Sequence, residues 1–249
     1  METILEVKDL RKSYPTFSLN NVSFRLFENT ITGFIGVNGS GKTTTIRTIL
    51  GLTLKDAGNI KIFGKDFIEH EKEIKNRIGF VFDEGYFYEH LTISEMKSVI
   101  APAYSTWSEM DFKSYLDRFH LDRKQKISTL SKGMRVKYAL SLALSHQADL
   151  LILDEPSSGL DPLVRSEIHQ LLLEYVSQKG KSVLFSTHIT SDLETIADAI
   201  LLIDKGNIIL NRDKAQLLAS HKSVQEGDPS QISSPTLEEI VLTCLRGGK

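Results

Sequence analysis

The chain has 249 residues, which is enough for one large domain or two lobes. Its apolar share of 41% and charged share of 25% are ordinary for a globular protein. The single cysteine, Cys244, excludes an internal disulfide framework and a zinc site built from cysteines. The formal net charge is only −2, so we expect no extended nucleic-acid interface and no nucleic-acid partner.

Apolar stretches in the sequence are short. The longest, residues 150–153 and 200–203, are far below the roughly 20 apolar residues that span a bilayer. Residues 1–6 lack the basic and apolar regions of a signal peptide. We therefore expect a cytoplasmic protein that reaches a membrane only through a partner.

The first third of the chain is predicted to contain short strands around one helix. The helix is expected from about Lys42 to Leu50, with Gly51 as its stop. Alternating apolar residues predict strands at residues 4–7, 22–26, 31–35, 59–63 and 78–82.

Residues 85–146 have a helical pattern, in which Ser94, Ser108 and Ser131 are candidate N-caps. Strand patterns return at residues 150–154, 182–186, 199–203 and 208–210. Helical stretches separate the first three, and this alternation predicts a parallel sheet with crossover helices. The sequence therefore predicts an α/β fold whose core is interrupted by a helical block.

After the main domain, residues 1–220, the chain is predicted to end in a polar linker and a short helix that docks either on the core or on a partner. Residues 221–235 are polar and rich in Ser, Gln and Pro, which indicates a flexible linker. Residues 236–239 have capping-box spacing ahead of an apolar run, so a short terminal helix is expected within residues 221–249.

Residues 36–43 read Gly-Val-Asn-Gly-Ser-Gly-Lys-Thr and match the phosphate-binding P-loop pattern. Glycines let backbone N–H groups turn towards an anion, and the following helix adds its positive dipole end. Lys42 would reach the β- and γ-phosphates, and Thr43 would place its hydroxyl on Mg²⁺. An unrelated glycine-rich turn is the alternative, but the flanking strand and helix patterns favour a nucleotide site. The candidate nucleotide-binding residues are Gly36, Asn38, Gly39, Ser40, Gly41, Lys42, Thr43 and Thr44.

A second candidate site follows the apolar run of residues 150–153, where the chain continues with Asp154 and Glu155. Acids at the carboxyl end of a strand in an open α/β sheet face the ligand crevice. Asp154 would hold Mg²⁺, and Glu155 could accept a proton from an attacking water. A solvated acidic turn is the alternative, which a P-loop in the same chain disfavours.

Further motifs accompany these two. Residues 129–134 read Thr-Leu-Ser-Lys-Gly-Met, residues 158–161 read Ser-Gly-Leu-Asp, and His188 follows a predicted strand. In this order the motifs resemble those of the ATP-binding-cassette (ABC) ATPases, over about residues 4–210. The resemblance implies a P-loop NTPase core with an antiparallel β subdomain and an inserted α-helical subdomain.

The resemblance also implies how the motifs work. Two cassettes would pack head to tail around two ATP molecules, so that Ser131 and Gly133 contact the γ-phosphate held by the other copy. His188 would contact the γ-phosphate and help to position the attacking water, although a lone histidine after a strand is often only structural. Tyr14 would stack on adenine, with Phe17 as the second choice and a core-edge tyrosine as the alternative.

Several positions depart from the family pattern. Asp83 stands where the family has a glutamine, and it could reach Mg²⁺ through water. Val37, Lys132 and Met134 replace a proline, a glycine and a glutamine. These variants resemble bacterial cassettes for the export of antimicrobial peptides, including the bacitracin type.

In functional terms, the resemblance implies a subunit that uses ATP and Mg²⁺ and pairs with a second cassette as a homodimer or heterodimer. This subunit would power a separate membrane-spanning permease and would lie at the inner face of the cell membrane. Residues 85–91 contain three aromatics and are a candidate docking surface, although core packing explains them equally well. One alternative is a soluble ABC ATPase that acts on nucleic acid or ribosomes, against which the single cassette and the absence of long heptads argue. The other is a nucleotide-gated binding module, against which the paired Asp154 and Glu155 argue.

Overall fold

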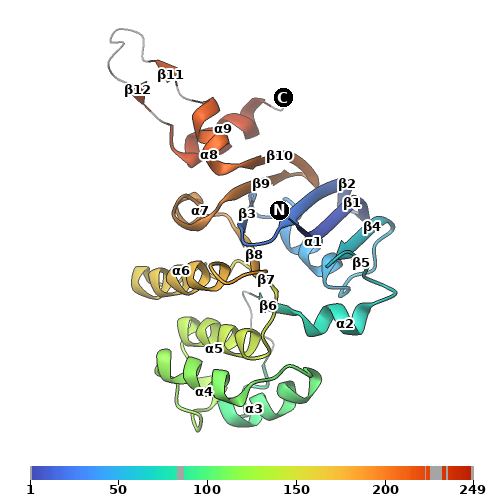
Figure 1. The fold of residues 1–249 in the computed structure, drawn as a ribbon. Coiled ribbons are helices and arrows are strands. Elements are labelled where there is room, and N and C mark those ends of the chain that lie inside the picture. The colour runs from blue at the N-terminus through green and yellow to red at the C-terminus, as the bar shows by residue number, and fades with distance from the viewer. Residues whose placement is uncertain (1, 83–86, 222, 225–231, 234, 248–249) are drawn as a thin grey trace.

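The computed structural model describes residues 2–82, 87–221, 223–224, 232–233 and 235–247. Within these ranges the strands form two large sheets and one short hairpin, and helices pack on the larger sheet (Figure 1). The architecture is α/β, as the sequence predicts.

The larger sheet has the strand order β10-β9-β3-β8-β7-β6. Its strands are β3 (Ile31–Ile35), β6 (Ile78–Phe82), β7 (Leu150–Asp154), β8 (Ser182–Thr187), β9 (Ala199–Asp204) and β10 (Asn207–Asp213). β10, at the edge, runs antiparallel to β9, and the other neighbours are parallel. The predicted parallel sheet is therefore confirmed.

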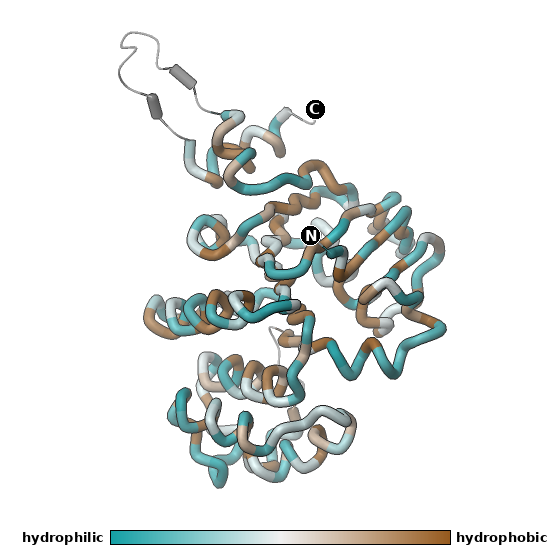
Figure 2. Tube along the Cα trace, in the orientation of Figure 1, coloured by the Kyte–Doolittle hydropathy of each residue, from teal (hydrophilic) through white to brown (hydrophobic). Residues whose placement is uncertain are grey.

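Both faces of this sheet are covered, which explains why its central strands are continuous apolar runs. The covering helices include α1 (Lys42–Ile49), α5 (Lys132–Ser145), α6 (Pro162–Val176) and α7 (Thr190–Ile196). In β7, Leu150 and Ile152 belong to the core shared with α1 and the antiparallel sheet, whereas Leu151 and Leu153 belong to the core shared with α5, α6 and α7. Figure 2 shows hydrophobic and hydrophilic residues in alternation along helices such as α6, as expected for helices with one buried face.

The smaller sheet is antiparallel and has the order β2-β1-β4-β5. Its strands are β1 (Thr3–Tyr14), β2 (Phe17–Phe27), β4 (Ala57–Ile62) and β5 (Lys65–Asp66). β1 and β2 are much longer than the sequence predicts, because the pairing register shifts at three places along them and interrupts the apolar alternation. Asp9, at one of these shifts, has a φ of 51°. The antiparallel subdomain that the resemblance implies is confirmed.

The inserted helical group lies beyond β6 and β7, at the bottom of Figure 1. It contains α3 (Ile93–Ile100), α4 (Glu109–Arg118), α5 and two short 3₁₀ turns (Ala101–Ala103 and Ile127–Thr129). Ser108 and Ser131 are N-caps, as predicted, and their hydroxyls accept hydrogen bonds from the N–H groups of Asp111 and Met134. The prediction for Ser94 is wrong. Thr92 caps α3 instead, because it forms a reciprocal capping box with Glu95.

Helix α2 (Glu71–Asn76) is absent from the prediction because it buries only Ile74 and so carries no apolar stripe.

The last elements are α8 (Lys214–Ser220), β11 (Ser223–Val224), β12 (Ile232–Ser233) and α9 (Leu237–Gly247). The terminal helix α9 packs on α7 and buries Leu237, Ile240 and Val241. β11 and β12 pair where the sequence indicates only a linker. Among the helices of the described ranges, none has the length and apolar character needed to cross a membrane.

Candidate nucleotide site

Three segments of the chain meet at the carboxyl edge of the larger sheet. The P-loop follows β3, Glu155 follows β7 and His188 follows β8. β3 and β8 end level with each other because Ile35 pairs with Thr187, and β7 is the other neighbour of β8. Distant parts of the sequence therefore share one edge, where open α/β sheets bind their ligands.

The P-loop has the backbone conformation that its glycines predict. Gly39 and Gly41 have φ values of 79° and 117°, which glycine adopts without steric cost. A side chain on Gly36 is excluded, since a Cβ there would lie 2.5 Å from the carbonyl oxygen of Ile203. Lys42 begins α1 and is buried, and its Nζ donates a 2.7 Å hydrogen bond to the Gly36 carbonyl.

The turn between β9 and β10 supports the P-loop. The sequence analysis missed this contact. The Gly206 N–H donates a 2.9 Å hydrogen bond to the Ser40 carbonyl, and the Gly206 carbonyl accepts one of 2.8 Å from Asn20. A Cβ on Gly206 would lie 1.8 Å from the carbonyl oxygen of Ser18. A glycine in a predicted turn was the only available signal, and the contact itself depends on the tertiary fold.

Asp154 and Thr43 lie together at the base of the site. The Ser186 hydroxyl donates a 2.7 Å hydrogen bond to Asp154 Oδ1. Burial raises the pKa of Asp154, while hydrogen bonds from Ser186 and Thr43 and the charge of Lys42 lower it. A carboxylate oxygen next to a threonine hydroxyl is a ligand pair that suits Mg²⁺.

Glu155 stands between two other predicted residues. Its Oε1 is 3.1 Å from Lys42 Nζ, and its Oε2 is 2.8 Å from His188 Nδ1. The Glu155 side chain is 15% exposed and the His188 side chain 43% exposed. Glu155 also has a φ of 52°, a left-handed conformation that is strained for a residue with a side chain. The structure therefore brings Lys42, Glu155 and His188 into one constellation.

These groups fit a magnesium-bound nucleoside triphosphate. The buried Lys42 ammonium and the N-terminus of α1 favour an anion at the P-loop. The Ser40 hydroxyl is buried and has no hydrogen-bond partner among the described residues, so a polar ligand could satisfy it. Thr43 and Asp154 would supply oxygen ligands for the metal ion.

The two aromatic candidates for adenine lie on either side of one β-turn. Tyr14 ends β1 with 44% of its surface exposed, and Lys12 Nζ is 5.5 Å from its ring centre. Phe17 begins β2 and packs on the P-loop, since its Cζ is 2.8 Å from the place where a Cβ on Gly41 would lie. Tyr14 therefore has the more open ring face, and Phe17 supports the loop.

Ser131 and Gly133 lie at the start of α5, away from these contacts. The Ser131 hydroxyl accepts from Met134 N–H at 3.3 Å, and Gly133 faces Val164 of α6. In the part of the chain that the structure describes, no hydrogen bond or ion pair joins either residue to the P-loop. Their role across a dimer interface remains a prediction.

The predictions for Asp83 and for Gly85 and Tyr86 lie outside the described residues. The rest of that aromatic run divides into two environments. Phe87 packs on Tyr138 of α5 with ring centres 5.1 Å apart, whereas Tyr88 is 59% exposed. The run therefore serves both core packing and the surface.

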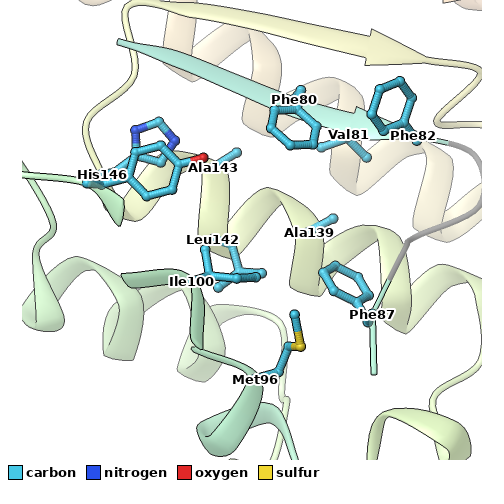
Figure 3. A pocket seen from close by; sticks show the side chains of 11 residues that line it. Phe80, Val81, Phe82, Phe87, Met96, Ile100, Ala139, Leu142, Ala143 and His146 are labelled. Atoms are coloured by element: carbon cyan, nitrogen blue, oxygen red, sulfur yellow. The ribbon is translucent and has the colours of Figure 1, made fainter. Parts of the chain in front are cut away.

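An apolar groove between β6 and the helical group is a feature that the sequence analysis missed (Figure 3). Its volume is about 280 Å³, and Phe80 at its upper rim is 45% exposed. The side chains of Met96, Leu142 and Phe87 line the opposite wall. In the sequence, Phe80 was the available signal of this groove, because it is an aromatic residue on the outward face of a strand. The groove itself forms only when α3 and α5 pack against β6.

The strand order, the P-loop and the adjoining acid pair define a P-loop nucleotide-binding protein of the ABC ATPase type. The family model described as "ABC transporter" matches residues 19–158. The chain is 34% identical over 212 residues to the bacitracin transport ATP-binding protein BcrA of Bacillus licheniformis, covering 84% of this chain and 69% of that protein. It is 35% identical to the ABC-type transporter ATP-binding protein EcsA of Bacillus subtilis, covering 83% and 85%.

A solved structure described as the ATP-binding subunit of an ABC transporter superposes with a TM-score of 0.83 at 27% identity, covering 97% of this chain and 99% of that one. The chain therefore belongs to the family of ABC transporter ATP-binding proteins.

Proposed function

We propose that this chain hydrolyses ATP and thereby powers a separate membrane permease that exports peptide antibiotics from a bacterial cell. The observation that carries the proposal is the position of Glu155, which is 3.1 Å from Lys42 Nζ and 2.8 Å from His188 Nδ1 beside a P-loop. The bacitracin transport named for BcrA supports the substrate class. Such a subunit acts at the inner face of the cell membrane.

Each residue of the constellation has one task in hydrolysis. Lys42 and the glycine-loop amides hold the phosphates, and Thr43 and Asp154 hold Mg²⁺, which supplies charge neutralisation at the phosphates. Glu155 accepts the proton of the attacking water, and His188 orients the Glu155 carboxylate through its Nδ1 contact.

A second cassette completes the site. Ser131 presents its hydroxyl at the exposed N-terminus of a fourteen-residue helix, and Gly133 supplies a backbone N–H in the first turn of that helix. Facing the P-loop of another copy, this helix end would bind the terminal phosphate, and ATP would bridge the two subunits. Hydrolysis would remove the bridge and reopen the dimer.

The permease would bind the apolar groove of Figure 3, on the flank of β6 and α5. An amphipathic helix is a suitable occupant, because the groove is lined mainly by apolar side chains and 45% of the surface of Phe80 is exposed there. Movement of the helical group on dimer closure would then be transmitted to the membrane subunit.

The test is phosphate release by the purified chain in ATP and Mg²⁺, with and without a candidate membrane subunit, such as a multi-span protein encoded by a neighbouring gene. Lys42→Ala is the control, and we expect it to abolish both nucleotide binding and phosphate release, because the buried ammonium is the main counter-charge for the phosphates. Nucleotide binding without turnover would instead support a gated binding module. Copurification with ribosomes rather than with a membrane protein would contradict the transport proposal.

A further inference from the structure

A buried polar cluster lies directly behind the candidate site. Asp192 of α7 is only 1% exposed, and its Oδ2 accepts a 2.5 Å hydrogen bond from the hydroxyl of Ser157. Ser157 is fully buried and lies two residues after Glu155, in the loop that leads to α6. Asp192 lies four residues after His188. One hydrogen bond therefore joins the two segments that carry the reacting carboxylate and its histidine.

The other oxygen of Asp192 faces helix α6. Arg165 Nη1 and His169 Nε2 each lie 3.5 Å from Oδ1. Burial lowers the pKa of His169, which leaves Arg165 as the cation that balances the carboxylate at neutral pH. Asp192 thus contacts the loop, the helix that follows the loop and, through its own helix, the segment of His188.

A buried carboxylate at position 192 lowers the stability of the fold, so its presence suggests a role other than stability. Transfer of a charge into the core carries a large desolvation penalty, and an apolar residue would pack with the neighbouring Leu193 and Ile196 without that penalty. The loop it holds is also strained, because Glu155 has a φ of 52°. Strained conformations persist only where the surroundings over-determine them.

The loop has other bonds among the described residues. The Glu155 carboxylate contacts His188 and Lys42, and the Asp161 side chain caps α6. The Glu155 N–H donates to the Ser186 carbonyl at 3.0 Å, and the Leu160 N–H donates to the Ser157 carbonyl at 3.2 Å. None of these bonds reaches α7. In the described part of the chain, the Ser157–Asp192 hydrogen bond is therefore the side-chain bond that joins the loop to the helix behind His188.

We propose that Asp192 is a positioning residue for hydrolysis: through Ser157 it holds the loop of residues 155–161 so that the Glu155 carboxylate stays in register with His188. The inference rests on the proposed function, since it needs Glu155 to act on water. It adds to the P-loop and the acid pair a third requirement for hydrolysis, the Ser157–Asp192 hydrogen bond.

The test compares Ser157→Ala, Asp192→Asn and the double variant with the wild-type chain in steady-state phosphate release and in ATP binding. We expect each single variant to lower kcat about tenfold or more while the ATP affinity stays within about threefold, because small displacements of a reacting group are costly whereas the phosphate contacts are untouched. The double variant should be no slower than the slower single variant, because both remove the same bond.

Ser182→Ala is the matched control. Ser182 is also buried, and its hydroxyl donates a 2.9 Å bond to the Phe27 carbonyl at the opposite end of β8. If Asp192→Asn does not fold, the Ser157→Ala variant, which loses only one hydroxyl, carries the test. Thermal unfolding of every variant separates lost stability from lost turnover.

The outcomes distinguish this inference from the proposed function. A wild-type chain that releases no phosphate overturns the proposed function and the inference with it. A wild-type chain that is active, with Ser157→Ala and Asp192→Asn equally active or impaired only in ATP binding, overturns the inference alone. Equal losses of kcat in the Ser182→Ala control would show a general packing effect and would also reject it.

Discussion

Replacing Glu155 by glutamine separates the two roles that its position implies. Glutamine has nearly the same size as glutamate and keeps polar atoms in the places of the two carboxylate oxygens. In the wild-type chain these oxygens lie 3.1 Å from Lys42 Nζ and 2.8 Å from His188 Nδ1. The substitution removes the negative charge and with it the proton acceptor. Loss of a general base costs about 10²–10⁴-fold in rate, so we expect turnover to fall by that factor.

Although turnover falls in the glutamine variant, its affinity for ADP should rise. Lys42 must leave Glu155 to reach a phosphate, and two unit charges 3.1 Å apart attract by about 5 kcal/mol at an effective dielectric constant of 20. Rehydration of the 15%-exposed carboxylate offsets most of this attraction. We expect a net gain of about 1 kcal/mol, which corresponds to roughly fivefold tighter ADP binding by the glutamine variant.

Titration calorimetry with ADP measures this gain without the contribution of an ATP-bridged dimer. Phosphate release and gel filtration in ATP measure turnover and the trapped dimer on the same samples. Glu174→Gln is the matched control, because Glu174 pairs with Arg118 at 2.6 Å on the surface of α6, away from the P-loop. Full hydrolysis by the Glu155 variant would refute its role as the base, and unchanged ADP affinity would refute competition for Lys42.

Tyr14→Ala should weaken ATP binding by about 1–3 kcal/mol while Tyr14→Phe does not, because an aromatic face suffices for stacking; equal loss in both would reject stacking. Gly206→Ala should destabilise the fold in urea far more than Gly180→Ala. Both glycines have left-handed φ values, 75° and 78°, but only at Gly206 would a Cβ meet backbone, at 1.8 Å. Burial lowers the pKa of His146 from 6.5 to about 4, so below pH 6.5 the unfolded chain binds a proton that the folded chain does not. Stability should therefore fall by about 2 kcal/mol from pH 7 to pH 5, and His146→Phe should abolish that slope in urea unfolding.

The local chemistry of the site could be predicted from the sequence because it depends on spacing along one segment. Glycines at fixed intervals before Lys42 predict the left-handed turns of the P-loop, and apolar runs that end at Asp154 and before His188 predict strand ends. Parallel strands place their carboxyl ends on one edge, so the meeting of these segments follows from the predicted sheet.

Elements whose stability comes from pairing rather than from periodicity were predicted poorly. β1 and β2 are longer than their apolar alternation indicates, since register shifts let the strands continue past polar residues. The cap of α3 was misassigned because Ser94 and Thr92 are both good N-cap types, and the choice depends on the reciprocal bond to Glu95.

Asp192 shows where a sequence signal existed but was ambiguous. An acid in the first turn of a helix is normally a solvated partner of the helix dipole, and α7 presents Asp192 in that position. Yet Asp192 precedes Leu193 and lies four residues before Ile196, so it shares the buried face of the helix. A charge on an apolar face requires a buried partner, and only the fold supplies Ser157 from 35 residues away. A polar residue that breaks an apolar stripe is thus the pattern by which such positioning residues can be sought in sequence.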